Sequence, residues 1–141
     1  LGDVYKRQVQ RSALSSAGET AGVVPFTIDL TSCTPGADVS VYFEKDQYVS
    51  TEGRLKNTLS DGTEAENVDV ELLNTRFTPI NLAETPAVAA DGTIARPDVI
   101  PVAVAEQDGS ASLPFYARYY ATDAATAGKV ATYVNFTVVY P

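Results

Sequence analysis

The 141-residue chain is long enough for one domain with a single core, and its 45% apolar and 20% charged residues are typical of a folded protein rather than a disordered one. Its net charge of −8 opposes attraction to nucleic acid and to anionic membrane surfaces, so neither is expected as a partner. The lack of histidine and tryptophan removes the commonest general base, the commonest zinc ligand and the usual platform for sugar stacking.

The first eight residues differ in character from the rest of the chain. They carry the basic pair Lys6 and Arg7, although the chain as a whole is acidic. We expect residues 1–8 to be a non-native or disordered leader, with a frayed native terminus as the alternative. The single domain is predicted to cover residues 9–141.

Three segments in the first half of the chain, 23–30, 37–44 and 67–74, alternate apolar and polar residues. This period of two is typical of strands with one buried face. The predicted inward residues are Val24, Phe26, Ile28 and Leu30 in the first segment, Val39, Val41 and Phe43 in the second, and Val68, Val70 and Leu72 in the third. Between the last two, residues 54–59 allow only a short hairpin.

Residues 83–109 are rich in alanine, proline and aspartate and are predicted to form a surface loop region. Pro86, Pro97 and Pro101 argue against a helix there, and the apolar run 99–104 could form a short strand. Short strands with regular turn signals, and no useful helical periodicity, predict an all-β sandwich.

The end of the chain, residues 128–141, is the strongest strand prediction. Its apolar residues recur at every second position from Val130 to Tyr140. We expect no later hairpin to pair with this strand, and a long apolar edge is a template for an extended segment of another chain.

These features resemble a known family, the subunits of bacterial chaperone-usher fimbriae, in particular the type 1-like major pilins. Members of that family end in an alternating apolar strand with a penultimate tyrosine and a glycine fourteen residues from the C-terminus. Tyr140 and Gly128 stand at those places, and the segment 113–122, with the sequence LPFYARYYAT, resembles the family's penultimate strand. Residues 9–16, 23–33 and 67–82 also resemble family segments.

The resemblance implies an immunoglobulin-like β-sandwich that lacks its final strand and is completed by a donor strand. It further implies a structural role in an extracellular, cell-surface fimbria that is reached through the periplasm and supports cell adhesion. The implied partners are neighbouring pilin subunits, a periplasmic chaperone and an outer-membrane usher, with no small-molecule substrate and no cofactor.

The contact with a partner strand is predicted from the same resemblance and from the alternation of the last strand. The residues expected to make it are Gly128, Val130, Val134, Phe136, Val138 and Tyr140, with Gly128 allowing close backbone approach. In the family, a cysteine at the position of Cys33 pairs with an earlier cysteine, which this sequence lacks. From composition alone, a lone buried thiol is the preferred interpretation of Cys33.

No catalytic residue and no metal site is predicted. No Gly-x-Ser-x-Gly motif is present, and the acidic residues between 61 and 69 do not have the spacing of a calcium-binding EF-hand loop. They are more typical of a solvated turn beside Gly62. The alternative function is a secreted β-sandwich module that binds carbohydrate or acts as an adhesin; an enzyme would need an acid pair in a cleft.

Overall fold

The computed structural model describes residues 2–9, 14–84, 87–88, 94–95 and 100–139. Its ten regular elements in these residues are all β-strands, and no helix in this part of the chain is long and apolar enough to cross a membrane. The fold is therefore all-β, as predicted.

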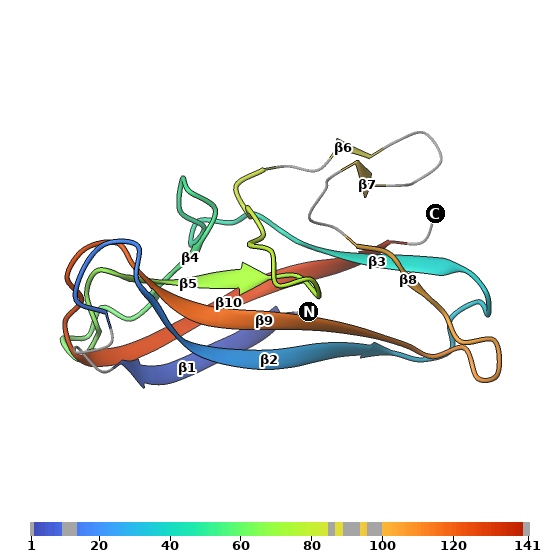
Figure 1. Ribbon diagram of the computed structural model, residues 1–141, viewed down its shortest axis with the longest axis horizontal. Coiled ribbons are helices and arrows are strands. Elements are labelled where there is room, and N and C mark those ends of the chain that lie inside the picture. The colour runs from blue at the N-terminus through green and yellow to red at the C-terminus, as the bar shows by residue number, and fades with distance from the viewer. Residues whose placement is uncertain (1, 10–13, 85–86, 89–93, 96–99, 140–141) are drawn as a thin grey trace.

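Eight of these strands form two four-stranded sheets that face each other (Figure 1). The first sheet has the order β1 (Gly2–Val9), β10 (Gly128–Val139), β3 (Asp38–Phe43) and β8 (Val102–Ala103). The second has the order β2 (Thr20–Leu30), β9 (Ala111–Ala121), β5 (Val68–Leu73) and β4 (Leu55–Lys56). A separate hairpin joins β6 (Ala87–Val88) to β7 (Ile94–Ala95). Neighbouring strands in all three sheets pair antiparallel.

The core lies between the two layers and is built from the alternate residues of each strand. The predicted inward residues of β3 and β5 are buried, as are Val130 and Val134 of β10, and Val39, Val70 and Val130 are each 0% exposed. Phe115 of β9 contacts two other phenylalanines, with ring centroids 5.6 Å from Phe26 and 5.0 Å from Phe43. Such aromatic pairs add about 0.5–1.5 kcal/mol to the burial of their area.

The shorter predicted strands differ from the observed ones. The hairpin expected within 54–59 is absent, because Leu55–Lys56 pairs with Val70 and Asp69 of β5 instead. In the described part of the run expected at 99–104, a strand forms at Val102–Ala103 and pairs with β3. Much of the predicted loop region, including Pro86 and Pro97, lies outside the described residues.

The acidic residues of β5 are buried, although alternation placed them on the polar face. Their carboxylates are covered by arginines: Arg54 Nε lies 3.2 Å from Asp69 Oδ2, and an Arg118 Nη lies 2.7 Å from Glu71 Oε1. The Arg54 guanidinium also lies 3.9 Å from the centre of the Tyr120 ring. The outer face of the second sheet is thus closed by ion pairs that the local sequence does not reveal.

Candidate functional site: the edge of strand β10

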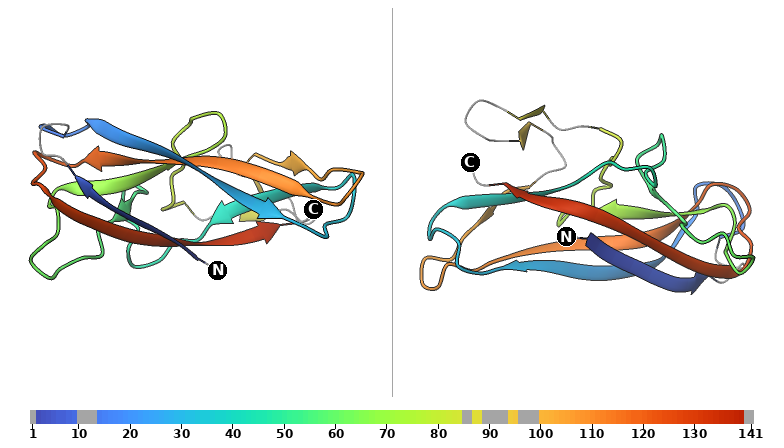
Figure 2. Two further views of the ribbon diagram at one scale, coloured as in Figure 1. Left: turned by 90° about the horizontal axis from the view of Figure 1, so that it is seen from below. Right: turned by 180° about the vertical axis from the view of Figure 1, so that it is seen from behind.

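Strand β10 changes its pairing partner halfway along its length. From Gly128 to Asn135 it pairs with β1, and from Phe136 to Val139 it pairs with β3. These partners lie on opposite edges, because β10 stands between β1 and β3 in the sheet (Figure 2). Most residues of the expected leader therefore lie in strand β1; their origin stays a prediction.

The hydrogen bonds of β10 show which main-chain groups face each edge. The carbonyls of Lys129, Ala131 and Asn135 accept from the amides of residues 65, 58 and 44, at 2.9, 2.8 and 2.7 Å, on the edge away from β1. Because successive residues of a strand direct their main-chain groups to opposite edges, the even-numbered residues face the β1 edge. Their side chains also point into the core.

Every residue predicted to contact a partner strand is even-numbered, so all share this edge. Val130 and Val134 are buried, at 0% and 3% exposure, and their edge is paired with β1. Phe136 and Val138 are only partly buried against the core. In the described part of the chain no strand pairs with the β1-side edge beyond Asn135. Tyr140 lies outside the described residues.

Gly128 begins β10 in close contact with the chain itself. A Cβ atom at this position would lie 2.5 Å from the amide nitrogen of Ala65 and 2.6 Å from the carbonyl carbon of Glu64. The close backbone approach expected at Gly128 is therefore made with the segment 64–65.

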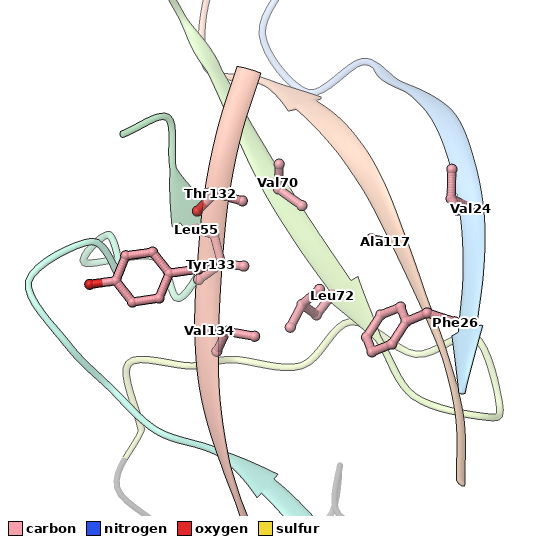
Figure 3. A pocket seen from close by; sticks show the side chains of 9 residues that line it. All are labelled: Val24, Phe26, Leu55, Val70, Leu72, Ala117, Thr132, Tyr133 and Val134. Atoms are coloured by element: carbon pink, nitrogen blue, oxygen red, sulfur yellow. The ribbon is translucent and has the colours of Figure 1, made fainter. Parts of the chain in front are cut away.

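A cavity of about 50 Å³ lies behind β10, between the two sheets (Figure 3). Its lining is almost entirely apolar and comes from β2, β4, β5, β9 and β10: Val24, Phe26, Leu55, Val70, Leu72, Ala117, Thr132, Tyr133 and Val134. On the β2 side the inward residues Phe26, Ile28 and Leu30 are only partly buried. The sandwich is thus incompletely packed near β2 and β10.

Sequence reasoning missed the segment that flanks the first half of β10 on its other edge. This segment, 57–65, contains no strand, yet it bonds the main chain of Lys129 and Ala131. Asn57 and Thr58 contribute side-chain bonds, while Thr63 and Ala65 bond Lys129 through their main chain. In the sequence Asn57 and Thr58 look only like polar loop residues.

Cys33 is buried just after β2, and its Sγ lies 3.8 Å from the carbonyl oxygen of Thr31. The sequence contains no second cysteine for a disulfide within the chain.

The predicted solvated turn is present at Asp61, whose carboxylate accepts hydrogen bonds from Thr63. These bonds lower the pKa of Asp61. Asp69 is separate, in β5, where burial raises its pKa more than Arg54 lowers it. Among the described residues no three histidine, cysteine or acidic side chains are grouped so that they could hold a metal ion.

Comparison with known proteins identifies the family of the chain. The family model described as "FimA: Type-1 fimbrial protein, A" matches residues 7–141. The chain is 41% identical over 133 residues to the major fimbrial subunit SMF-1 of Stenotrophomonas maltophilia, covering 94% of this chain and 74% of that protein. It is 37% identical over 139 residues to the F17 fimbrial protein of Escherichia coli, covering 94% and 71%.

A solved structure shares the fold. The antigen and type I fimbria protein of Burkholderia pseudomallei aligns with a TM-score of 0.61 at 21% identity, over 99% of this chain and 97% of that one. The sandwich is thus the immunoglobulin-like fold of fimbrial proteins, as the resemblance implied. The chain belongs to the type-1 fimbrial protein A family, and it is a structural subunit that assembles with other pilin subunits into a cell-surface fimbria.

Proposed function

We propose that the β1-side edge of β10 accepts an extended segment of another subunit as an added strand, and that subunits join into a filament by this contact. The proposal rests on the burial and the strand pairing of Phe136 and Val138. Both are apolar and partly buried, and their edge lacks a strand partner among the described residues. Main-chain hydrogen bonds to such an edge supply affinity, and alternate side chains supply specificity.

The open edge gives the incoming strand a place to start. Phe136 and Val138 are available first, and the paired stretch from Asn135 back to Gly128 follows. The new strand extends along β10 by replacing β1, rung by rung, so the core beneath Val130 and Val134 stays covered throughout. An apolar residue of the donor at every second position would then reach the incompletely packed region near β2 and β10.

A contact between a donor segment and a groove elsewhere on an identical subunit is heterologous. Such contacts do not form a two-fold dimer, and they yield an open filament when the rotation between successive subunits does not close a ring. Before assembly the same edge needs another cover, which we assign to a strand of a periplasmic chaperone, with an outer-membrane usher as the site of exchange. The family membership of the chain supports this assignment.

The proposal is tested with a synthetic peptide of alternating apolar residues, titrated into the chain while binding heat and melting temperature are recorded. Binding should raise the melting temperature, since a ligand that binds only the folded state stabilises it. Phe136→Asp should abolish binding, because it places a charged side chain among the apolar residues of the β1-side edge of β10. Asn135→Asp is the matched control and should retain binding, because this side chain points to the opposite face of β10.

If Phe136→Asp does not fold, Phe136→Ala carries the same test with a smaller loss of affinity. A wild-type chain that melts cooperatively and is indifferent to the peptide would refute strand acceptance. That result would favour a module that binds a ligand at another surface.

A further inference from the structure

The first half of β10 is flanked by a loop on the edge away from β1. Residues 57–65 occupy the position that β3 takes beside the second half of β10. The amide of Lys129 donates to the carbonyl of Thr63 at 2.9 Å, and its carbonyl accepts from the amide of Ala65 at 2.9 Å. These two bonds form a single parallel bridge between Glu64 and Lys129, and among the described residues no strand ladder continues it along β10.

The side chain of Asn57 supplies the missing rung. Its Nδ2 donates to the carbonyl of Lys129 at 2.9 Å and to that of Ala65 at 3.1 Å. Its Oδ1 accepts from the amide of Ala131 at 3.1 Å and from that of Leu59 at 3.2 Å. A carbonyl and the amide two residues later are the pair that one residue of a parallel strand would engage, so the side-chain amide stands in for a peptide group opposite Val130.

Thr58 bonds the next group along the strand. Its amide and its hydroxyl both donate to the carbonyl of Ala131, each at 2.8 Å. Because the amide alone satisfies this carbonyl, the hydroxyl is redundant, whereas Asn57 has no such substitute at the Ala131 amide. The bonding of this flank to β10 thus depends more on the Asn57 side chain than on the Thr58 hydroxyl.

We propose that Asn57 is a positioning residue for strand acceptance: by fixing Lys129 and Ala131, it holds the main-chain groups of Val130 and Thr132 toward the acceptor edge. It does this without touching the incoming strand. The inference rests on the proposed function of that edge. The second half of β10 is held independently by β3, so Phe136 and Val138 do not depend on Asn57.

This division between the halves of β10 makes the inference testable by amide hydrogen exchange in the peptide complex. In the wild-type complex the amides of Val130, Thr132, Phe136 and Val138 should all be protected. In Asn57→Ala the protection of Val130 and Thr132 should fall at least tenfold, while that of Phe136 and Val138 is unchanged. The peptide should also bind about tenfold more weakly, as expected for loss of one or two hydrogen bonds.

Thr58→Val is the matched control, because it keeps the side-chain shape and the amide bond to Ala131 while it removes the hydroxyl. Its exchange pattern and affinity should stay within about twofold of wild type. If Asn57→Ala does not fold, Asn57→Leu carries the same test, since it keeps a branched side chain of similar size and removes both the Oδ1 acceptor and the Nδ2 donor.

The two hypotheses fail differently. An Asn57→Ala complex with wild-type protection at Val130 and Thr132, or with protection lowered equally in both halves of β10, overturns the positioning role and leaves strand acceptance standing. A wild-type chain in which the peptide protects none of these amides overturns both.

Discussion

The amide of Glu44 donates a 2.7 Å hydrogen bond to the carbonyl of Asn135 at the residue where β10 changes partners. On one side of this bond β10 is an inner strand between β1 and the segment 57–65, and on the other it pairs with β3. Phe136 is the next residue, and its main-chain groups face the edge that β1 has just left. In the described residues the change of partner along β10 thus falls between two neighbouring residues, Asn135 and Phe136.

Strand β1 should compete with an incoming strand, and proline substitutions can show this. Arg7 pairs with Val130, so its amide faces β10, whereas the amide of Lys6, opposite Ala131, faces away. Arg7→Pro removes a ladder donor and should raise the affinity for the donor peptide several-fold, because β1 is then displaced more easily. Lys6→Pro removes the same charge and should leave the affinity near wild type. Equal affinities in calorimetry for Arg7→Pro, Lys6→Pro and wild type would argue against competition by β1.

Gly128→Ala should destabilise the fold by about 1–3 kcal/mol, the usual cost of forcing an extra methyl group into a packed site. The added Cβ would lie 2.5 Å from the amide nitrogen of Ala65, and main chain cannot move aside as a flexible side chain can. Gly62 has open space around it but a φ of +94°, so Gly62→Ala measures backbone strain alone, about 1 kcal/mol. Urea unfolding compares the variants, and an unchanged midpoint for Gly128→Ala would rule out the crowding.

Thr132→Val should stabilise the chain. Thr132 is 1% exposed and lines the apolar cavity, and its Oγ1 has no hydrogen-bond partner among the described residues. Replacing an unsatisfied buried hydroxyl by a methyl group of the same shape should add about 1–2 kcal/mol and raise the melting temperature by roughly 3–6 °C.

The matched change Thr137→Val has the opposite expectation. The Thr137 hydroxyl donates to the carboxylate of Glu44, so its loss should leave stability unchanged or slightly lower. A Thr132→Val variant that melts below wild type in calorimetry would show that the Thr132 hydroxyl has a partner.

The contribution of Asp69 to stability should decrease as the pH rises. Burial raises its pKa above 3.8, and the hydrogen bond and charge of Arg54 offset this only in part. A raised pKa in the folded state means that the protonated form is favoured by folding. The stabilisation is fully present below the unfolded pKa of 3.8 and is lost as the pH rises through the folded value. The free energy of unfolding of wild type minus that of Asp69→Asn should therefore fall from pH 3 toward neutrality.

Asp61 provides the opposite case for the same pH series. Its pKa is lowered from 3.8 by hydrogen bonds from Thr63, so its contribution is present above that value and is lost as the pH falls. The free energy of unfolding of wild type minus that of Asp61→Asn should therefore rise as the pH rises from 3 toward neutrality. A difference for Asp69→Asn that is flat or increases with pH in urea unfolding would mean that the ion pair with Arg54 outweighs burial.

The parts of the fold that could be predicted depend on local alternation. The period of two in β2, β3, β5, β9 and β10 is imposed by burial of one face, so it is visible in the sequence. The inward position of Val130, Val134 and Phe136 follows from it. Their placement on the β1-side edge then follows from strand geometry once one flanking hydrogen bond is known.

The parts that could not be predicted depend on contacts between distant residues. Asp69 and Glu71 look like solvent-facing acids, but Arg54 and Arg118, which cover them, lie 15 and 47 residues away. Asn57 reads as a loop residue because its role arises only when residues 129–131 are brought beside it. The pairing of β1 with β10 joins the two ends of the chain, and no pattern within Gly2–Val9 predicts it.

The most direct test of strand acceptance is amide hydrogen exchange at Phe136 and Val138, with and without the donor peptide. These amides face the edge that has no strand partner among the described residues, whereas those of Thr137 and Val139 face β3 and should be protected already. If β10 accepts a strand at this edge, the peptide should slow exchange at Phe136 and Val138 strongly and leave Thr137 and Val139 unchanged. Peptide binding that leaves exchange at Phe136 and Val138 as fast as in the free chain would contradict it.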